Sequence, residues 1–203
     1  MGPVGFDLDM TLIDSRSAIL ASFAGLGRDT GTAIDLAAVD RRLGLKLEDE
    51  LAFWYPPDRR AAAAAIYRRR YVRLAGQMTT LLPGAPEALA AVRAAGQRVV
   101  IITAKHPVSV EPCLQAVGLA PDEVFTFVHG PEKAAVLSSI NAAAYVGDSP
   151  PDMAAAADAG VRAVGVTTGS FAAGELAAAG ADVILDSLAG FPDWYRSALS
   201  GAP

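Results

Sequence analysis

The sequence has few of the features that mark secreted or membrane proteins. It contains a single cysteine, Cys113, so no disulfide can form within the 203-residue chain, which fits a reducing compartment. No apolar run approaches the ~20 residues that a membrane-spanning helix needs. The start MGPVGFDLD lacks the basic segment followed by a long apolar segment that marks a signal peptide. These absences predict a soluble, cytoplasmic protein with no membrane partner.

Positive charge is also scarce. The chain has 17 Lys and Arg against 22 Asp and Glu, which gives a formal net charge of -5. A protein of this charge is not attracted as a whole to phosphate-rich nucleic acid, so we expect no nucleic-acid partner. Its 52% of hydrophobic residues and 19% of charged residues are typical of a globular protein.

Short β-branched runs alternate with alanine-rich helical segments after residue 80. Each run is apolar and bounded by Gly, Pro or Asp, a pattern typical of strands buried on both faces. Strand and helix in alternation predict an α/β fold, a parallel sheet with helices on both faces. We expect its strands at residues 3–7, 98–103, 124–128, 143–148, 161–167 and 181–186.

Residues 15–82 have a different pattern. They contain no convincing strand, and three segments at residues 14–27, 35–44 and 59–76 are helical candidates. The chain therefore divides into an α/β core formed by residues 1–14 and 83–203, and a helical insertion of residues 15–82.

Several polar residues are expected at one edge of the sheet. Ligands of open parallel sheets bind beyond the carboxyl ends of the strands. Asp152 follows one helical turn after Asp148 and can return to the same edge. The candidates that stand at strand ends, or next to them in this arrangement, are Asp7, Asp9, Thr103, Lys133, Asp148 and Asp152.

These residues lie in motifs that resemble a known family. DLDMTLIDS, IIT, Lys133 and VGDSPPD resemble, in order, the four motifs of the haloacid dehalogenase (HAD) superfamily. The helical insertion resembles the α-helical cap of that superfamily. The segments LLPGAPEALAAVRAAG and GVTTGS are similar to its phosphoglycolate phosphatase-like branch. The resemblance covers nearly the whole chain and implies a Rossmann-like core with an inserted cap.

The resemblance also implies roles for the candidates. Asp7 would attack phosphorus and form an aspartyl-phosphate, while Asp9 would act as general acid and then as general base. Thr103 and Lys133 would bind the phosphoryl oxygens. The metal ligands would be Asp7, the backbone carbonyl of Asp9, Asp148 and Asp152. The implied reaction is hydrolysis of a small phosphorylated metabolite.

Charge balance gives an independent reason for a cation. Two carboxylates ~4 Å apart repel by roughly 4 kcal/mol at an effective dielectric of ~20. Asp7, Asp9, Asp148 and Asp152 together carry about −4 when ionised, of which Lys133 offsets one. A divalent cation offsets two more, and carboxylate oxygens beside a phosphate favour Mg²⁺.

The sequence departs from the family at two points. Met10 stands where the family usually has Gly, and Lys133 lacks the usual Lys-Pro-x-Pro context, so Lys105 is the alternative phosphate-binding lysine. An acid at position 9 disfavours carbon–halogen cleavage, which needs no proton donor. A phosphosugar mutase and a catalytically silent binding protein stay open as alternatives.

The insertion offers two candidates for substrate recognition. Lys46 precedes a helix that we expect to begin near Glu48, and Arg16 lies where the chain leaves the core. Either could contact an anionic or hydroxyl-rich leaving group, or be a surface charge. The sequence predicts neither the particular ester nor the oligomeric state.

Overall fold

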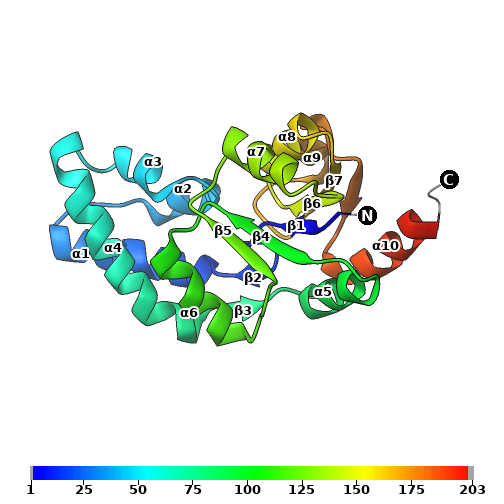
Figure 1. The fold of residues 1–203 in the computed structure, drawn as a ribbon. Coiled ribbons are helices and arrows are strands. Elements are labelled where there is room, and N and C mark those ends of the chain that lie inside the picture. The colour runs from blue at the N-terminus through cyan, green and yellow to red at the C-terminus, as the bar shows by residue number, and fades with distance from the viewer. Residues whose placement is uncertain (1, 201–203) are drawn as a thin grey trace.

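The computed structural model describes residues 2–200, and its centre is a six-stranded parallel sheet (Figure 1). The strand order is β5–β4–β1–β6–β7–β8, so the first strand lies in the middle of the sheet. This arrangement confirms the predicted α/β class. The strands are β1 (Val4–Phe6), β4 (Val99–Thr103), β5 (Glu123–Thr126), β6 (Ala144–Gly147), β7 (Arg162–Val166) and β8 (Val183–Leu185).

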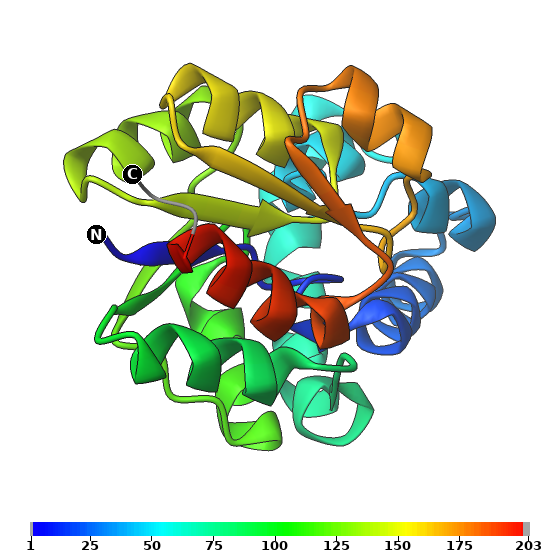
Figure 2. The ribbon, with the colours of Figure 1, turned by 90° about the vertical axis from the view of Figure 1, so that its right-hand side faces the viewer.

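Alternate residues of each strand face opposite layers of helices (Figure 2). In β4, Val99 and Ile101 belong to the core on one face, and Val100 and Ile102 belong to the core on the other. The first face packs against α5 (Ala85–Ala94), α6 (Pro107–Val117) and α10 (Phe191–Ser200). The second packs against α7 (Pro131–Ser139), α8 (Pro150–Asp158) and α9 (Ala173–Ala178).

Three of these helices begin with a proline close to the functional edge of the sheet. Pro107, Pro131 and Pro150 open α6, α7 and α8. Proline is suited to the first helical position because its φ angle is already helical and the missing N–H has no partner there. These helix starts place Lys133 and Asp152 in the first turns of α7 and α8.

The helical insertion lies between two very short strands. β2 (Ile13–Asp14) pairs antiparallel with β3 (Thr80–Leu81), and between them run α1 (Arg16–Thr30), α2 (Leu36–Arg41), α3 (Leu47–Ala52) and α4 (Pro57–Met78). Helices α1 and α4 contact each other, with the Phe23 and Tyr67 rings 4.7 Å apart. Figure 1 shows all four helices beside the sheet end where the strands terminate. The division into core and cap domains stays a prediction.

Several elements differ from the sequence-based expectation, among them β2, since no strand was expected at Ile13–Asp14. The segment 15–82 was expected to lack strands, yet it contains β3, whose two exposed residues offer no alternating pattern to detect. Helix α10 was not predicted, although Phe191 and Tyr195 on it are buried. The outer strands β5 and β8 are half-buried, because each has a neighbour on only one side. Among residues 2–200, no helix is both long and apolar enough to span a bilayer.

Met10 occupies a backbone conformation that usually favours glycine. Its φ angle is 61°, in the left-handed region. The turn is held by hydrogen bonds from the Met10 amide to the Ile13 carbonyl (2.8 Å) and from the Thr168 hydroxyl to the Met10 carbonyl (2.5 Å). The Met10 side chain is buried, so its packing offsets part of the conformational cost.

The chain re-enters the core at Gly84, and a substitution at this residue can test how closely the backbone packs there. Gly84 has a φ of 84°, and a Cβ at this position would overlap the backbone of Leu188 and Ala189. Gly96 has a similar φ of 74° but open space around it. We expect Gly84→Ala to lower the free energy of unfolding by about 1–3 kcal/mol more than Gly96→Ala. Urea denaturation of both variants measures this; equal losses would contradict the packing.

Candidate active site

The carboxyl ends of three strands meet at one cavity. Asp7 follows β1, Thr103 ends β4 and Asp148 follows β6. The structure brings all six sequence-predicted core residues together, since they line this cavity: Asp7, Asp9, Thr103, Lys133, Asp148 and Asp152. Their roles in chemistry stay predictions that the geometry below supports.

Three of the carboxylates form a compact buried cluster. One oxygen from each of Asp7, Asp148 and Asp152 lies within 4.8 Å of the others. All three residues are less than 9% exposed. The carboxylate of Asp9 is not part of this cluster, which leaves only its backbone carbonyl as the ligand implied by the resemblance.

Lys133 lies between two members of the cluster. Its Nζ donates to Asp7 Oδ1 and to Asp152 Oδ1, both at 2.7 Å. The side chain is itself 7% exposed, so these ion pairs are shielded from water. Its ammonium stabilises the ionised form of both carboxylates.

Hydroxyl groups orient the carboxylates. The Thr11 hydroxyl donates to Asp148 Oδ1 at 2.9 Å, and Ser149 and Tyr145 donate to Asp152 at 2.6 and 3.2 Å. Sequence reasoning did not select these three residues. Thr11 and Ser149 stand inside the recognised motifs, which is a usable signal, whereas Tyr145 looks like any apolar strand residue.

Burial dominates the electrostatics of the cluster. Desolvation raises the pKa of Asp7 to about 7, although Lys133 partly counteracts this. Burial, together with Asp152 and Asp7, raises the pKa of Asp148 well above its ordinary value. The neighbouring carboxylates Asp152 and Asp7 raise the pKa of Lys133 in spite of its burial. One lysine therefore does not neutralise the cluster.

The residues present fit a divalent metal ion. A buried cluster of carboxylate oxygens that one lysine leaves under-neutralised is a suitable donor set for a hard cation. Gly169 adds a close approach at the same place, since a Cβ there would overlap the Asp148 carboxylate. Asp7, Asp148 and Asp152 would hold the ion.

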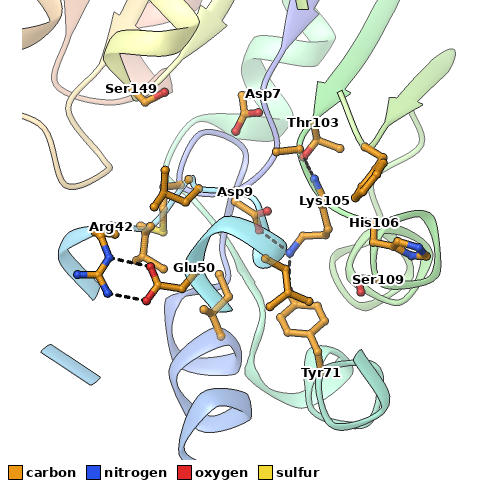
Figure 3. A pocket seen from close by; sticks show the side chains of 18 of the residues that line it. Asp7, Asp9, Arg42, Glu50, Tyr71, Thr103, Lys105, His106, Ser109 and Ser149 are labelled. Atoms are coloured by element: carbon orange, nitrogen blue, oxygen red, sulfur yellow. Dashed lines mark hydrogen bonds and ion pairs between the residues drawn. The ribbon is translucent and has the colours of Figure 1, made fainter. Parts of the chain in front are cut away.

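Asp9 belongs to a second network that includes the helical insertion (Figure 3). Lys105 Nζ lies 2.9 Å from Asp9 Oδ1 and donates to the Tyr71 hydroxyl on α4, also at 2.9 Å. The Ser15 hydroxyl donates to the same Asp9 oxygen. The Lys105 amide donates to the Thr103 hydroxyl at 3.1 Å. The two lysines thus serve different carboxylates: Lys133 contacts Asp7, and Lys105 contacts Asp9.

The two candidates in the insertion lie apart from these networks. Arg16 pairs with Asp40 at 3.2 Å, and Lys46 lies 4.0 Å from Glu132 across the boundary between insertion and core. Neither is among the residues that line the cavity. Their contact with substrate stays a prediction, and the structure supplies no direct support for it.

Comparison with known proteins agrees with this site. Residues 4–157 match the family model described as haloacid dehalogenase-like hydrolase, and residues 130–191 match a second one, described as HAD-hydrolase-like. The chain belongs to the haloacid dehalogenase-like hydrolase family.

Similar proteins support the same family. The chain is 31% identical to "Probable phosphatase IndB" of Dickeya dadantii, over 90% of this chain and 88% of that protein. It is also 31% identical to a plasmid-encoded phosphoglycolate phosphatase of Cupriavidus necator, over 92% and 89% of the two chains. A hydrolase structure from Pseudomonas syringae shares the fold, with a TM-score of 0.82 at 23% identity, over 97% and 98% of the two chains.

The acidic cluster predicts a stability that depends on pH and on metal. Because the pKa of Asp7 is raised from 3.8 to about 7 in the folded protein, the native state holds a proton that the unfolded state releases. Without metal, stability should therefore fall as pH rises through this window. Metal ligands must be deprotonated, so Mg²⁺ held by these carboxylates should raise the melting temperature more at about pH 7.5 than at about pH 5.

Thermal unfolding with chelator or with Mg²⁺, at both pH values, measures this response. Asp148→Asn should abolish the stabilisation by Mg²⁺, whereas Asp193→Asn, at an exposed surface carboxylate, should retain it. Equal stabilisation of wild type and Asp148→Asn would show that the ion binds elsewhere.

Proposed function

We propose that the protein is a Mg²⁺-dependent phosphatase that hydrolyses a small phosphate monoester through an aspartyl-phosphate. The observation that carries the proposal is the arrangement of Asp7, which is paired with Lys133 and clustered with Asp148 and Asp152 at the end of the central strand. The phosphatase relatives support the same class of substrate.

The first chemical step belongs to Asp7. A carboxylate oxygen of Asp7 attacks phosphorus, the bond from phosphorus to the alcohol oxygen breaks, and Asp9 gives its proton to that oxygen. Lys133 and the Thr103 hydroxyl stabilise the charge on the phosphoryl oxygens. The amide of Lys105 donates to the Thr103 oxygen, which leaves the hydroxyl proton available to the phosphoryl group.

The second step releases phosphate. Asp9, now a carboxylate, takes a proton from a water molecule, whose oxygen attacks phosphorus and displaces the Asp7 carboxylate. Lys105 and Ser15 hold Asp9 through both steps. A bound divalent ion would supply positive charge beside the phosphoryl group and lessen its repulsion from the carboxylates.

Residues 15–82 would act as the cap over this site. Helices α1 to α4 supply cavity-lining side chains, among them Phe23 and Tyr67, opposite the carboxylates of the core. A cap of this kind excludes water from the reacting phosphorus and contacts the alcohol of the ester.

Substitutions of the two acids should separate nucleophile from general acid. We expect Asp7→Asn to abolish turnover of every ester. Asp9→Asn should slow alkyl phosphates about 100-fold or more and slow an aryl phosphate much less, because phenolates leave without a proton donor. Steady-state kinetics on both esters measures this, with EDTA-treated enzyme as the metal control. Equal losses on the two esters would contradict the general-acid role.

The two lysines should differ in the same assay. Lys133→Met leaves Asp7 and Asp152 without their cation, so we expect a loss of about 100-fold or more in kcat/KM on alkyl and aryl esters alike. Lys105→Met releases Asp9, so its loss should be larger on the alkyl ester, as for Asp9→Asn. The opposite pattern would make Lys105 the phosphate-binding lysine.

A further inference from the structure

The half of the cavity formed by the helical insertion is mostly apolar. It lies opposite the carboxylates and would face the alcohol part of a phosphate ester bound at Asp7. Every helix from α1 to α4 contributes to it, as does the loop between α2 and α3. The apolar and aromatic lining residues include Ile19, Phe23, Val39, Leu43, Leu47 and Tyr67.

Arg42 is one of the cations in this half, and the carboxylate of Glu50 already neutralises its charge. Its Nε and Nη2 donate to the two carboxylate oxygens of Glu50 at 2.8 and 2.6 Å (Figure 3). Glu50 is 4% exposed and also accepts from the Trp54 indole at 2.8 Å. The guanidinium lies 4.2 Å from the centroid of the Phe53 ring. Arg42 is therefore fixed in a bidentate pair that a substrate anion would have to break.

The second cation of this half is Arg68 on α4. Its Nη2 donates to Glu48, while its buried Nε has no hydrogen-bond partner in the part of the chain that the structure describes. Burial, with a contribution from Arg68, lowers the pKa of His106, so its imidazole is neutral near pH 7. Among the described residues of the insertion that line the cavity, both cations, Arg42 and Arg68, have a carboxylate partner.

This pairing determines which substrates the cavity can accept. A carboxylate or second phosphate entering here would lose its hydration, and it would meet the carboxylates of Glu48 and Glu50, which line the cavity beside the two arginines. An uncharged apolar group would instead replace water against the apolar walls. The cavity volume of about 120 Å³ also favours a compact group.

We propose that the substrate is the phosphate monoester of a compact, uncharged and largely apolar alcohol, and that the cavity disfavours esters with a second anionic group. This inference rests on the proposed phosphatase function. The proposed substrate class excludes phosphoglycolate, the compound in the name of the Cupriavidus necator relative, because phosphoglycolate carries a second anionic group. It also disfavours a phosphosugar mutase, whose reaction passes through a bisphosphate.

A matched pair of esters tests the inference on the wild-type enzyme with Mg²⁺. Isobutyl phosphate and phosphoglycolate have the same heavy-atom skeleton, but the first ends in two methyl groups and the second in a carboxylate. We expect kcat/KM to be about tenfold or more higher for isobutyl phosphate. Equal values, or a preference for phosphoglycolate, would overturn the inference.

A substitution at the cavity mouth tests the cause. Leu45 lines the cavity and is 47% exposed, so a longer side chain is tolerated there. Leu45→Lys adds a cation to the two arginines of this half and should raise kcat/KM for phosphoglycolate relative to isobutyl phosphate about tenfold. Leu45→Met, which has no charge, should keep the wild-type order. A similar shift in both variants, or in neither, would contradict the charge argument.

An aryl phosphate run in parallel separates two kinds of failure. Hydrolysis of this ester that depends on Asp7, combined with a preference for phosphoglycolate, would overturn the substrate inference and leave the phosphatase function intact. Absence of hydrolysis for all three esters would overturn both.

Discussion

The contact of Lys133 with Asp7 and Asp152 is the interaction on which the rest of the site depends. Three buried carboxylates within 4.8 Å of one another cannot all be ionised without nearby positive charge. Lys133 supplies one charge at 2.7 Å from two of them. The remaining imbalance is what makes the cluster suited to a divalent ion, and to a phosphate that arrives with it.

The pairing register of the sheet strands brings the residues of this site together. Phe6 pairs with Ile101 of β4 and with Val146 of β6, so β1 lies between the two strands that end in Thr103 and at Asp148. Both neighbouring strands therefore end within two residues of the position that lies opposite Asp7 in the sheet. Helices α7 and α8 then start beside the same edge and bring in Lys133 and Asp152. The chemistry therefore depends on strand order as much as on the residues themselves.

Sequence patterns predicted the core well because local physics and the fold agree there. Buried strands such as β4 are continuous apolar runs, and polar residues interrupt them only where the strands end. The ordered motifs then indicated which polar residues meet. What the sequence could not predict depends on distant segments: the contact between Tyr71 and Lys105 joins residues 34 positions apart. The pairing of Arg42 with Glu50 likewise depends on how α2 and α3 are oriented.

The network around Asp9 joins the insertion to the proposed chemistry. Lys105 extends from the core and contacts Asp9 and the Tyr71 hydroxyl at the same distance, and Tyr71 in turn lies 3.1 Å from Cys113 Sγ on α6. Helix α4 thus helps to position Lys105, which contacts Asp9, the proposed general acid. The same helix contributes Tyr67 and Arg68 to the wall that would receive the alcohol. Because one helix contacts both, a displacement of α4 that altered the fit of the alcohol would also disturb the proposed general acid. In the proposed mechanism, selection of the leaving group and its protonation are therefore physically linked.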